Sequence, residues 1–480
     1  MNTHTPLLTD LYQLTMAAAY HASGRAEQEA VFHLFFRTLP FKGGYAIAAG
    51  LGSAVEWMKG FRFEADDLDY LATLRDAENA PLFKPAFLAY LADLRLSVTI
   101  DAMPEGTLVF PHQPLLRVTG PILQCQLLET ALLNIINFQT LIATKAARIC
   151  QAAQGEPVLE MGLRRAQGPD GALSASRAAH IGGCASTSNV LAGKTFGIPV
   201  KGTHAHSWVM SFETELEAFE QYAAALPGNC TFLVDTYDTL EGVRHAVEVG
   251  RKLRETGHRL LGIRLDSGDL AWLSQQARTI LDEAGFTDAA IVASNDLDEN
   301  LIESLKHQGA RIGIWGVGTK LVTGGDQSAL GGVYKLAAVR DDAGNWQPRI
   351  KLSEQAIKVS TPGLQQVRRF THDGQFVADA IYDAETTCPE PCVIVDPAEL
   401  LRHTTIATGT CHEDLLEPVF RDGQLIAPLP PLAESRARSL AQLAGLHPTI
   451  RRLANPHNYP AGLEAGLHQN KLALIQQARA

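Results

Sequence analysis

The feature that most constrains the fold is an alternation of short apolar runs with helix-length segments, which begins near residue 155 and continues to about residue 340. Each run is almost continuously apolar, which is typical of a parallel strand that is buried on both faces. The segments between the runs are long enough for helices, and several of them end in glycine. The predicted strands are residues 157–163, 198–204, 231–237, 260–267, 290–296 and 311–319, with 331–339 available to close the set. This repeat predicts a parallel α/β fold, and its length favours an irregular barrel over an open sheet.

The rest of the chain divides around this repeat. A chain of 480 residues is expected to hold two to four domains, at roughly 150 residues for each. Residues 1–130 mix short strands and helices, and proline and glycine become more frequent beyond residue 345. We therefore predict an N-terminal α/β domain over 1–130, the barrel with the active site over 131–345, and a C-terminal region over 346–480 that packs on the barrel.

Charge and composition exclude several classes of protein. The formal net charge is −11, so a broad nucleic-acid-binding surface is not expected. We expect no membrane helix, because no apolar run reaches the roughly 18 residues that one needs. The first basic residue is Arg25, which argues against a signal peptide. Seven thinly spread cysteines fit reduced thiols better than a disulfide framework, so we expect a cytoplasmic enzyme or binding protein.

Polar residues follow each predicted strand of the main set, and in a parallel barrel the active site lies at the carboxyl ends of the strands. Each of these residues on its own could simply begin a loop, but their joint density predicts a site. The candidates at these ends are Glu160, Arg164, Arg165, Lys201, Thr203, His204, His206, Ser207, Asp235, Asp238, Arg264, Asp266, Ser267, Asp269, Ser294, Asn295 and Asp296.

A glycine-rich segment, GIWGVGTKLVTGG (313–325), contains Gly316, Gly318 and Thr319 after a late strand. Backbone N–H groups can converge on an anion at such a turn, and barrels often place a phosphate at this position. The alternative is a plain glycine-rich turn. Arginines suit carboxylate and phosphate, so the Arg and Lys residues at the strand ends predict a basic pocket, unless they are salt-bridged to neighbouring acids.

The segment KGTHAHSWVMSF (201–212) holds two histidines two residues apart, so both could face the site from an extended backbone. A buried structural histidine is the alternative for each.

Three other segments resemble known motifs but do not match them. The Gly193–Thr195 segment is no Walker A motif, because its first glycine would fall at Ser188. The acidic stretch 235–242 lacks the paired acids of a ribose-phosphate motif, and the spacing of Cys388, Cys392, Cys411 and His412 is irregular for zinc.

Six motifs in order resemble the nicotinate phosphoribosyltransferase family. They are LTDLYQLTM (8–16), LRRAQGPDG (163–171), GTHAHSWVMSF (202–212), IRLDSGDL (263–270), GVGTKLVT (316–323) and LGGVYKL (330–336). The resemblance implies an N-terminal α/β region, an irregular α/β barrel and a C-terminal extension, in a homodimer with shared active sites. It also implies transfer of phosphoribose from phosphoribosyl pyrophosphate (PRPP) to nicotinate, with Mg²⁺ and coupled ATP hydrolysis, in NAD salvage.

The resemblance also implies roles for single residues. His206 matches a histidine that ATP phosphorylates, Arg264 matches an arginine on the nicotinate carboxylate, and Thr319 matches a PRPP contact. Tyr12 and Thr203 match positions that contact nicotinate. We expect the carboxylates Asp266, Asp235 and Glu160 to act at the ribose or on the metal, without assigning metal ligands. The expected substrate-binding residues are Tyr12, Thr203, Arg164, Arg165, Arg264, Ser267, Gly316, Gly318 and Thr319.

Other functions remain open from the residues alone. A nicotinamide phosphoribosyltransferase would share the fold and the phosphate loop but would bind an amide in place of a carboxylate. A quinolinate enzyme would be shorter and would need more basic residues. A Schiff-base barrel enzyme would use Lys201 or Lys320, and a non-catalytic metabolite-binding protein would have lost residues of the site.

Overall fold

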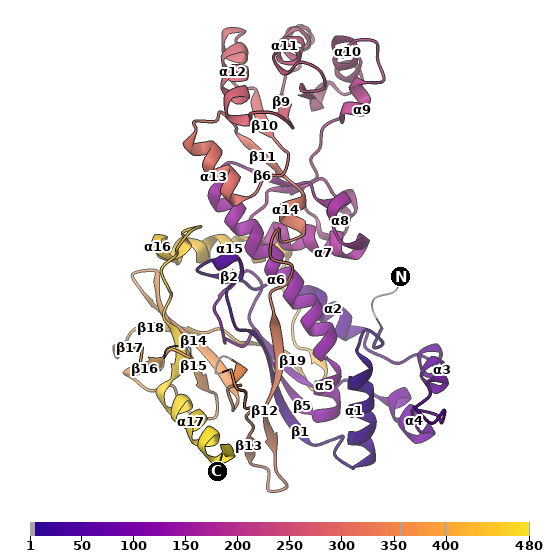
Figure 1. Cartoon of the computed structure of the whole chain (residues 1–480), viewed down its shortest axis with the longest axis vertical. Coiled ribbons are helices and arrows are strands. Elements are labelled where there is room, and N and C mark those ends of the chain that lie inside the picture. Colours follow the sequence, from indigo (N-terminus) through magenta and orange to yellow (C-terminus); the bar gives the residue numbers. More distant parts are fainter. Residues whose placement is uncertain (1–4, 356–357, 398, 400, 480) are drawn as a thin grey trace. The chain divides into compact units, whose positions relative to one another are not determined.

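The computed structural model describes residues 5–355, 358–397, 399 and 401–479, and the chain forms two compact units (Figure 1). Unit 1 comprises Met1–Leu141 and Ala329–Ala480, and unit 2 comprises Ile142–Ser328. The boundary falls inside helix α6 (Glu129–Ala152). The expected regions 1–130 and 346–480 therefore both fall in unit 1, whereas the expected barrel region 131–345 holds all of unit 2 together with short stretches of unit 1.

Unit 2 is built on a six-stranded parallel sheet in the order β7-β6-β11-β10-β9-β8. The strands are β6 (Val158–Glu160), β7 (Ser186–Thr187), β8 (Thr231–Leu233), β9 (Gly262–Leu265), β10 (Ala290–Ala293) and β11 (Ile314–Val317). Side chains such as Ile263, Leu265 and Trp315 are fully buried, as a parallel sheet covered on both faces requires. A single parallel bridge between Thr187 and Val200 extends the sheet past β7.

Helices follow these strands through short loops, as the alternating pattern predicts. The helices of unit 2 include α7 (Gly168–Ile181), α8 (Val190–Phe196), α9 (His206–Val209), α10 (Glu215–Ala225), α11 (Thr239–Glu255), α12 (Leu270–Glu283), α13 (Glu299–His307) and α14 (Thr319–Val322). Asp238, Asp269 and Asp298 cap α11, α12 and α13, since each carboxylate accepts the backbone N–H three residues on. These caps start each helix directly after its strand, which keeps the loops at the strand ends short.

Unit 1 contains a seven-stranded sheet in the order β13-β12-β1-β5-β3-β19-β20. Its strands are β1 (Glu29–Phe36), β3 (Thr99–Ala102), β5 (Leu116–Pro121), β12 (Gly332–Arg340), β13 (Trp346–Pro348), β19 (Glu417–Arg421) and β20 (Gln424–Leu425). The expectation that 331–339 could close the barrel is wrong, because β12 pairs antiparallel with β1 from Phe36↔Gly332 to Ala30↔Val339. A short apolar run fits a buried strand in the expected barrel as well as one in the antiparallel sheet of unit 1. The composition of 331–339 therefore does not distinguish the two positions.

The remaining N-terminal elements of unit 1 pack on this sheet and share its core, which includes Phe32, Phe36, Ile100 and Val118. They are α1 (Leu11–Ala22), α2 (Leu51–Lys59), α3 (Ala65–Thr73), α4 (Pro85–Asp93), α5 (Ile122–Leu127) and the pair β2 (Ala46–Ile47) and β4 (Leu108–Val109). Within the part of the chain that the structure describes, no helix combines the length and apolar character that crossing a membrane requires.

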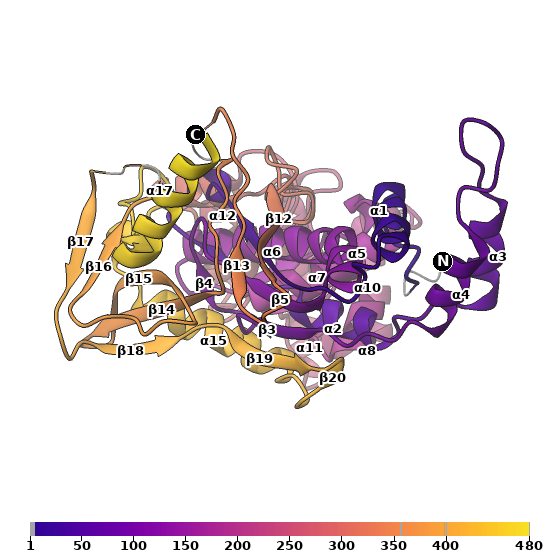
Figure 2. The ribbon, with the colours of Figure 1, turned by 90° about the horizontal axis from the view of Figure 1, so that it is seen from below.

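A second sheet of unit 1 has the order β17-β16-β21-β15-β14-β18. Its strands are β14 (Gln365–His372), β15 (Gln375–Asp383), β16 (Cys392–Val395), β17 (His403–Ile406), β18 (Cys411–Asp414) and β21 (Ala461–Glu464). Helices α15 (Leu432–Gly445), α16 (Pro448–Arg451) and α17 (Ala465–Arg479) complete the C-terminal part. Figure 2 shows α17 beside β15 and β16, which it contacts. A fully buried ion pair, Arg369 Nη2 to Asp379 Oδ2 at 2.7 Å, ties β14 to β15.

Candidate active site

Arg264 lies on β9, in the parallel sheet of unit 2 (Figure 1), and its guanidinium contacts residues at neighbouring strand ends. Its Nε donates to Ser294 Oγ at 2.9 Å and its Nη1 donates to Thr203 Oγ1 at 3.1 Å. Its Nη2 lies 3.2 Å from Asp266 Oδ1. These contacts engage three of the five N–H groups that an arginine carries, so two have no hydrogen-bond partner among the described residues and are available to a ligand. A rigid, largely buried guanidinium with two open donors suits a carboxylate.

Two carboxylates lie beside this arginine. Asp266 Oδ1 also accepts the hydroxyl of Ser294, so arginine and serine hold the same oxygen. Asp235 Oδ2 accepts the backbone N–H of Asp266 at 2.8 Å and the hydroxyl of Ser267 at 2.7 Å. The other oxygen, Asp235 Oδ1, is buried and has no hydrogen-bond partner among the described residues. Since an unpaired buried carboxylate oxygen is costly, this atom is a position where a cation or a donor group of a ligand fits.

His206 is the first residue of α9 and reaches the same cluster. Its Nδ1 lies 3.1 Å from Thr236 Oγ1, and its Nε2 lies 3.8 Å from Asp266 Oδ2. The second distance is too long for a hydrogen bond but short enough for attraction between an imidazolium and the carboxylate. The side chain is 40 % exposed, so a substrate can reach the ring.

His204 lies elsewhere, so the expectation that both histidines can face the site is wrong. Its ring packs against the aromatic rings of Phe219, Tyr222 and Phe232, and its Nε2 accepts the backbone N–H of Leu233 at 3.3 Å. Burial lowers the pKa of His204 to about 4, so it is neutral at pH 7. The two side chains diverge because the extended segment ends at Ala205, the N-cap of α9.

Glu160 lies at the end of β6, but the polypeptide itself engages its carboxylate. The residue is 1 % exposed. Its Oε1 accepts the backbone N–H of Gly162, and its Oε2 accepts the hydroxyls of Ser176 at 2.7 Å and Thr187 at 2.5 Å. This geometry favours a role in fixing the loop after β6. Arg164 and Arg165 follow in that loop, in a 3₁₀ turn over Leu163–Arg165, and both side chains are exposed.

The glycine-rich loop follows β11 and leads into α14, whose first residue is Thr319. A Cβ on Gly316 would lie 2.8 Å from the sulfur of Met161, and one on Gly318 would lie 3.1 Å from the carbonyl oxygen of Met161. The flexible Met161 side chain can move away from a Cβ on Gly316, whereas a Cβ on Gly318 would press on the backbone of Met161. Packing against the chain after β6 therefore favours glycine at 318 more than at 316, so Gly318 is weaker evidence for an anion than the sequence indicates.

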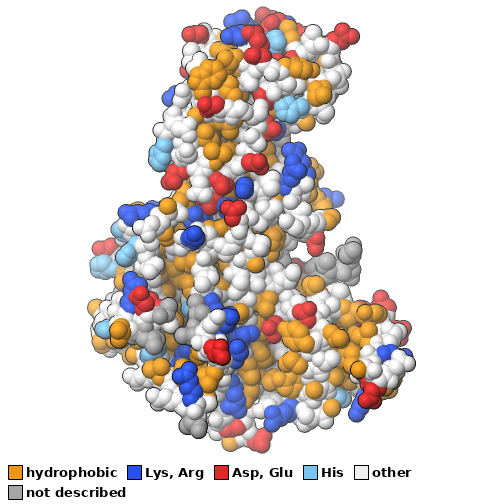
Figure 3. All heavy atoms as spheres, viewed as in Figure 1, with side chains coloured by type: hydrophobic (Ala, Val, Ile, Leu, Met, Phe, Trp, Pro, Cys, Tyr) orange, Lys and Arg blue, Asp and Glu red, His pale blue; other side chains and the backbone are white. Residues whose placement is uncertain are grey.

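Tyr12 lies on α1 in unit 1, whereas the strand-end cluster belongs to unit 2. Its ring is exposed, and burial of the hydroxyl together with the nearby Glu129 raises the pKa of Tyr12. Lys335 faces Glu129, and burial lowers the pKa of Lys335, as do Arg37 and Lys351 nearby. Basic side chains gather over β12 and β13 on the face in Figure 3.

Sequence reasoning missed two groups. Thr236 is not among the predicted site residues, although its hydroxyl contacts His206. It lies near the end of the predicted strand 231–237, beside the candidate Asp235, and that position is the signal that could have found it. The basic group around Lys335 was also missed, and no local signal marks it, because its members come from separate segments that only the fold brings together.

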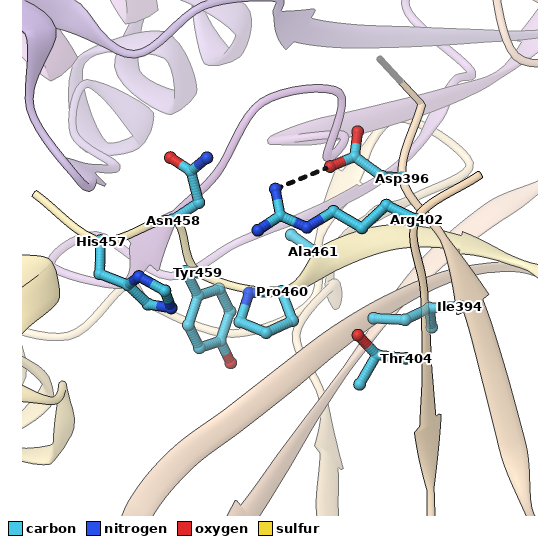
Figure 4. A pocket seen from close by; sticks show the side chains of 9 residues that line it. All are labelled: Ile394, Asp396, Arg402, Thr404, His457, Asn458, Tyr459, Pro460 and Ala461. Carbon is cyan, nitrogen blue, oxygen red and sulfur yellow. Dashed lines mark ion pairs between the residues drawn. The ribbon is translucent and has the colours of Figure 1, made fainter. Parts of the chain in front are cut away.

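Neither the cysteines nor a pocket beside the C-terminal sheet provides an alternative site. No group of three or more His, Cys, Asp or Glu side chains within the described ranges could hold a metal ion, so the Cys388–His412 zinc alternative is not supported. This pocket has a volume of about 130 Å³, and Arg402 Nη1 lies 3.9 Å from Asp396 Oδ2 within it. Figure 4 shows the side chains that line it. Substrate pockets measure about 300–1,000 Å³, so this cavity is too small for a nucleotide substrate.

Sequence comparisons decide the family. Three nicotinate phosphoribosyltransferase models match: an N-terminal domain over residues 7–137, the family itself over 157–354 and a C-terminal domain over 365–471. The nicotinate phosphoribosyltransferase of Bacillus subtilis is 44 % identical over 98 % of this chain and 96 % of its own length. The chain belongs to the nicotinate phosphoribosyltransferase family. The human nicotinate phosphoribosyltransferase is 39 % identical over 96 % of this chain and 95 % of its own length.

Solved structures agree with this assignment. The crystal structure of the human nicotinic acid phosphoribosyltransferase has a TM-score of 0.85 and 36 % identity, and the match covers 97 % of this chain and 99 % of that one. A nicotinate-nucleotide pyrophosphorylase from Pyrococcus furiosus has a TM-score of 0.70 at 21 % identity, over 91 % and 94 % of the two chains, which supports the fold alone. The predicted α/β class, with its parallel sheet, N-terminal α/β part and C-terminal extension, is thereby confirmed.

Proposed function

We propose that this member of the nicotinate phosphoribosyltransferase family joins nicotinate to the ribose C1 of PRPP in NAD salvage, giving nicotinate mononucleotide and pyrophosphate. Family membership over nearly the whole chain supports the reaction. The observation that supports nicotinate as the substrate is the environment of Arg264. Neighbours from three loops hold its guanidinium in place, and two of its N–H donors stay available for the nicotinate carboxylate. Thr203 lies beside it and completes the acid-binding position.

The chemistry needs positioning more than acid–base catalysis. The pyridine nitrogen already carries a lone pair, so it can attack the ribose C1 while the bond to pyrophosphate breaks, without loss of a proton. Orienting the two substrates can contribute at best roughly 7–11 kcal/mol toward the barrier. Fixed charges around the reacting atoms contribute much of the rest. Tyr12 is the proposed aromatic contact of the pyridine ring, and Thr319, Gly316, Gly318, Arg164 and Arg165 are the proposed contacts of the PRPP phosphates.

The residues present also fit Mg²⁺. This ion usually takes one or two carboxylates and fills its other positions with water and substrate phosphates. Asp235 offers a buried oxygen without a partner, and Asp266 lies next to it, so these two are the proposed holders of Mg²⁺ or of the ribose hydroxyls. Bound Mg²⁺ supplies positive charge that offsets the charge on the leaving pyrophosphate. Ser267 and Arg264 orient the two carboxylates.

We infer that His206 couples ATP hydrolysis to this transfer. Its ring is exposed, fixed on one side by Thr236, and close to Asp266. A ring nitrogen would attack the γ-phosphorus of ATP, forming an N–P bond as the bond to ADP breaks, and water would later hydrolyse the phosphohistidine. Phosphate on His206 would place new negative charge beside Asp266, and that change can shift the affinity of the site for its anionic substrates.

The active enzyme is proposed to be a cytoplasmic homodimer with shared sites. On α1, Leu11, Tyr12 and Met16 are exposed large hydrophobic residues, a surface that a second copy could cover. The seven free cysteines are in keeping with a reducing compartment.

The test is product formation from PRPP and Mg²⁺ with either nicotinate or nicotinamide, each with and without ATP. We expect nicotinate mononucleotide, formed faster when ATP is present. Product from nicotinamide alone would keep the phosphoribosyl site but overturn the assignment of Arg264 to a carboxylate. Absence of product from either base would refute the proposed function.

A further inference from the structure

Two thiols lie side by side in the C-terminal sheet of unit 1, and neither belongs to the residues assigned to catalysis. Cys388 belongs to the loop that joins β15 to β16, and Cys392 is the first residue of β16. Their sulfur atoms are 3.7 Å apart, and neither forms a disulfide. Both side chains belong to a small apolar cluster with Phe370 and Ile406.

Both thiols are buried, but the residues next to Cys388 in the sequence are exposed. Cys388 is 9 % exposed and Cys392 is 1 % exposed. The residues on either side of Cys388, Thr387 and Pro389, are exposed, as are Glu390 and Pro391. A small movement of this surface loop therefore gives a small oxidant access to Cys388 first.

The surroundings distinguish the two sulfurs. The hydrogen bond with Cys392 and the nearby Arg368 guanidinium lower the pKa of Cys388, against the effect of burial. The same hydrogen bond and burial raise the pKa of Cys392. Arg368 is held in place by Asp414, with Nε to Oδ1 and Nη2 to Oδ2 both at 2.9 Å. Cys388 therefore loses its proton more readily and borders exposed chain, which suits the attacking thiol, and the more deeply buried Cys392 suits the resolving thiol.

The spacing permits a bond between the two sulfurs. A disulfide requires about 2.05 Å between sulfur atoms, so the two must approach by roughly 1.7 Å. The three residues between them are exposed loop residues, which can take up this movement without displacing a strand.

We propose that Cys388 and Cys392 form a reversible oxidation site for a hydroperoxide. The Cys388 thiolate attacks the terminal oxygen, an S–O bond forms and the O–O bond breaks, giving a sulfenic acid at Cys388 and, with hydrogen peroxide, one water. The sulfur of Cys392 then attacks that of Cys388, the S–S bond forms, and the hydroxide that leaves takes the proton of Cys392. The two thiols lose two electrons in total, and hydrogen peroxide becomes two waters.

The chain offers a direct readout. Trypsin cleavage after Arg369 and Arg402 releases residues 370–402, which contain both thiols and no other cysteine. The reduced full-length protein is treated with hydrogen peroxide, alkylated, digested and analysed by mass spectrometry. We expect this peptide to be lighter by two hydrogen atoms and unalkylated, and to return to the doubly alkylated form after treatment with dithiothreitol.

Three variants separate the roles. In Cys392→Ser, oxidation should stop at a sulfenic acid on Cys388 that dimedone traps, whereas in Cys388→Ser residue 392 should stay alkylatable. Cys411→Ser is the matched control, because Cys411 is an exposed cysteine on β18, and it should form the 388–392 bond as the wild type does.

The proposal is overturned if peptide 370–402 of the wild type stays doubly alkylated under peroxide that oxidises Cys411. Release of zinc in place of disulfide formation would also overturn it. The wild-type measurement needs no variant, so it decides the question even if a serine variant fails to fold.

Discussion

Replacing Arg264 with alanine should weaken catalysis with nicotinate far more than it weakens folding. The substitution removes the two N–H donors that we assign to the nicotinate carboxylate, and it also leaves Asp266 without its cationic neighbour. A hydrogen bond to a charged group contributes about 1.5–3 kcal/mol, so the loss of two gives about 3–6 kcal/mol, or roughly a 10²- to 10⁴-fold fall in kcat/KM for nicotinate. Arg264→Lys keeps the charge but not the fork of donors, so its loss should be intermediate.

The assay is steady-state formation of nicotinate mononucleotide at saturating PRPP, Mg²⁺ and ATP, with nicotinate varied. Arg251→Ala is the matched control, because Arg251 is an exposed arginine on α11, and it should leave kcat/KM close to the wild-type value. Circular dichroism before the assay excludes a folding defect. If Arg264→Ala retained kcat/KM within about twofold of the control, the assignment of this arginine to the substrate carboxylate would be wrong.

Three further predictions concern coupling, packing and pH. His206→Ala should keep some phosphoribosyl transfer but lose its stimulation by ATP, and full stimulation in a coupled ADP assay would exclude His206 as the phosphorylated residue. Asp379→Ala should lower the free energy of unfolding by about 3–5 kcal/mol, because it removes the carboxylate that pairs with the buried Arg369. Asp342→Ala, at an exposed aspartate, should change the free energy of unfolding little, and equal denaturant midpoints for the two variants would contradict this prediction. Burial lowers the pKa of Lys471 from 10.5 to about 8. Between these two pH values the unfolded chain binds more protons than the folded protein, so the free energy of unfolding should rise with pH. In Lys471→Met this rise, at most about 3 kcal/mol, should vanish, and a wild-type melting temperature that falls relative to the variant over the same pH range would refute it.

The sequence was sufficient for the parallel sheet because each strand from β8 to β10 is a buried apolar run followed by an aspartate that caps the next helix. It was insufficient for 331–339, since a buried run reads the same beside β1 as it would in the barrel. The sequence also did not show that His204 is buried while His206 faces the site. Nor did it show that the polypeptide engages Glu160, whereas Asp235 and Asp266 stay available to a ligand. In both cases the deciding contacts, Leu233 for His204 and Ser176 with Thr187 for Glu160, come from distant segments.

The basic group on unit 1 shows the same limit. Its members come from separate parts of the chain: Arg37, His112, Lys335, Lys351 and Lys471. Burial, and then repulsion by the neighbouring basic groups, lowers the pKa values of His112 and Lys335. No spacing rule links these residues, so only the fold identifies them as neighbours.

The substrate that we propose is the acid, nicotinate, and not the amide. The most direct test is a competition in which equal concentrations of nicotinate and nicotinamide share one reaction with PRPP, Mg²⁺ and ATP, and the products are separated by chromatography. The structure of the Arg264 cluster predicts nicotinate mononucleotide, with an equal amount of pyrophosphate. Nicotinamide mononucleotide as the main product would contradict it.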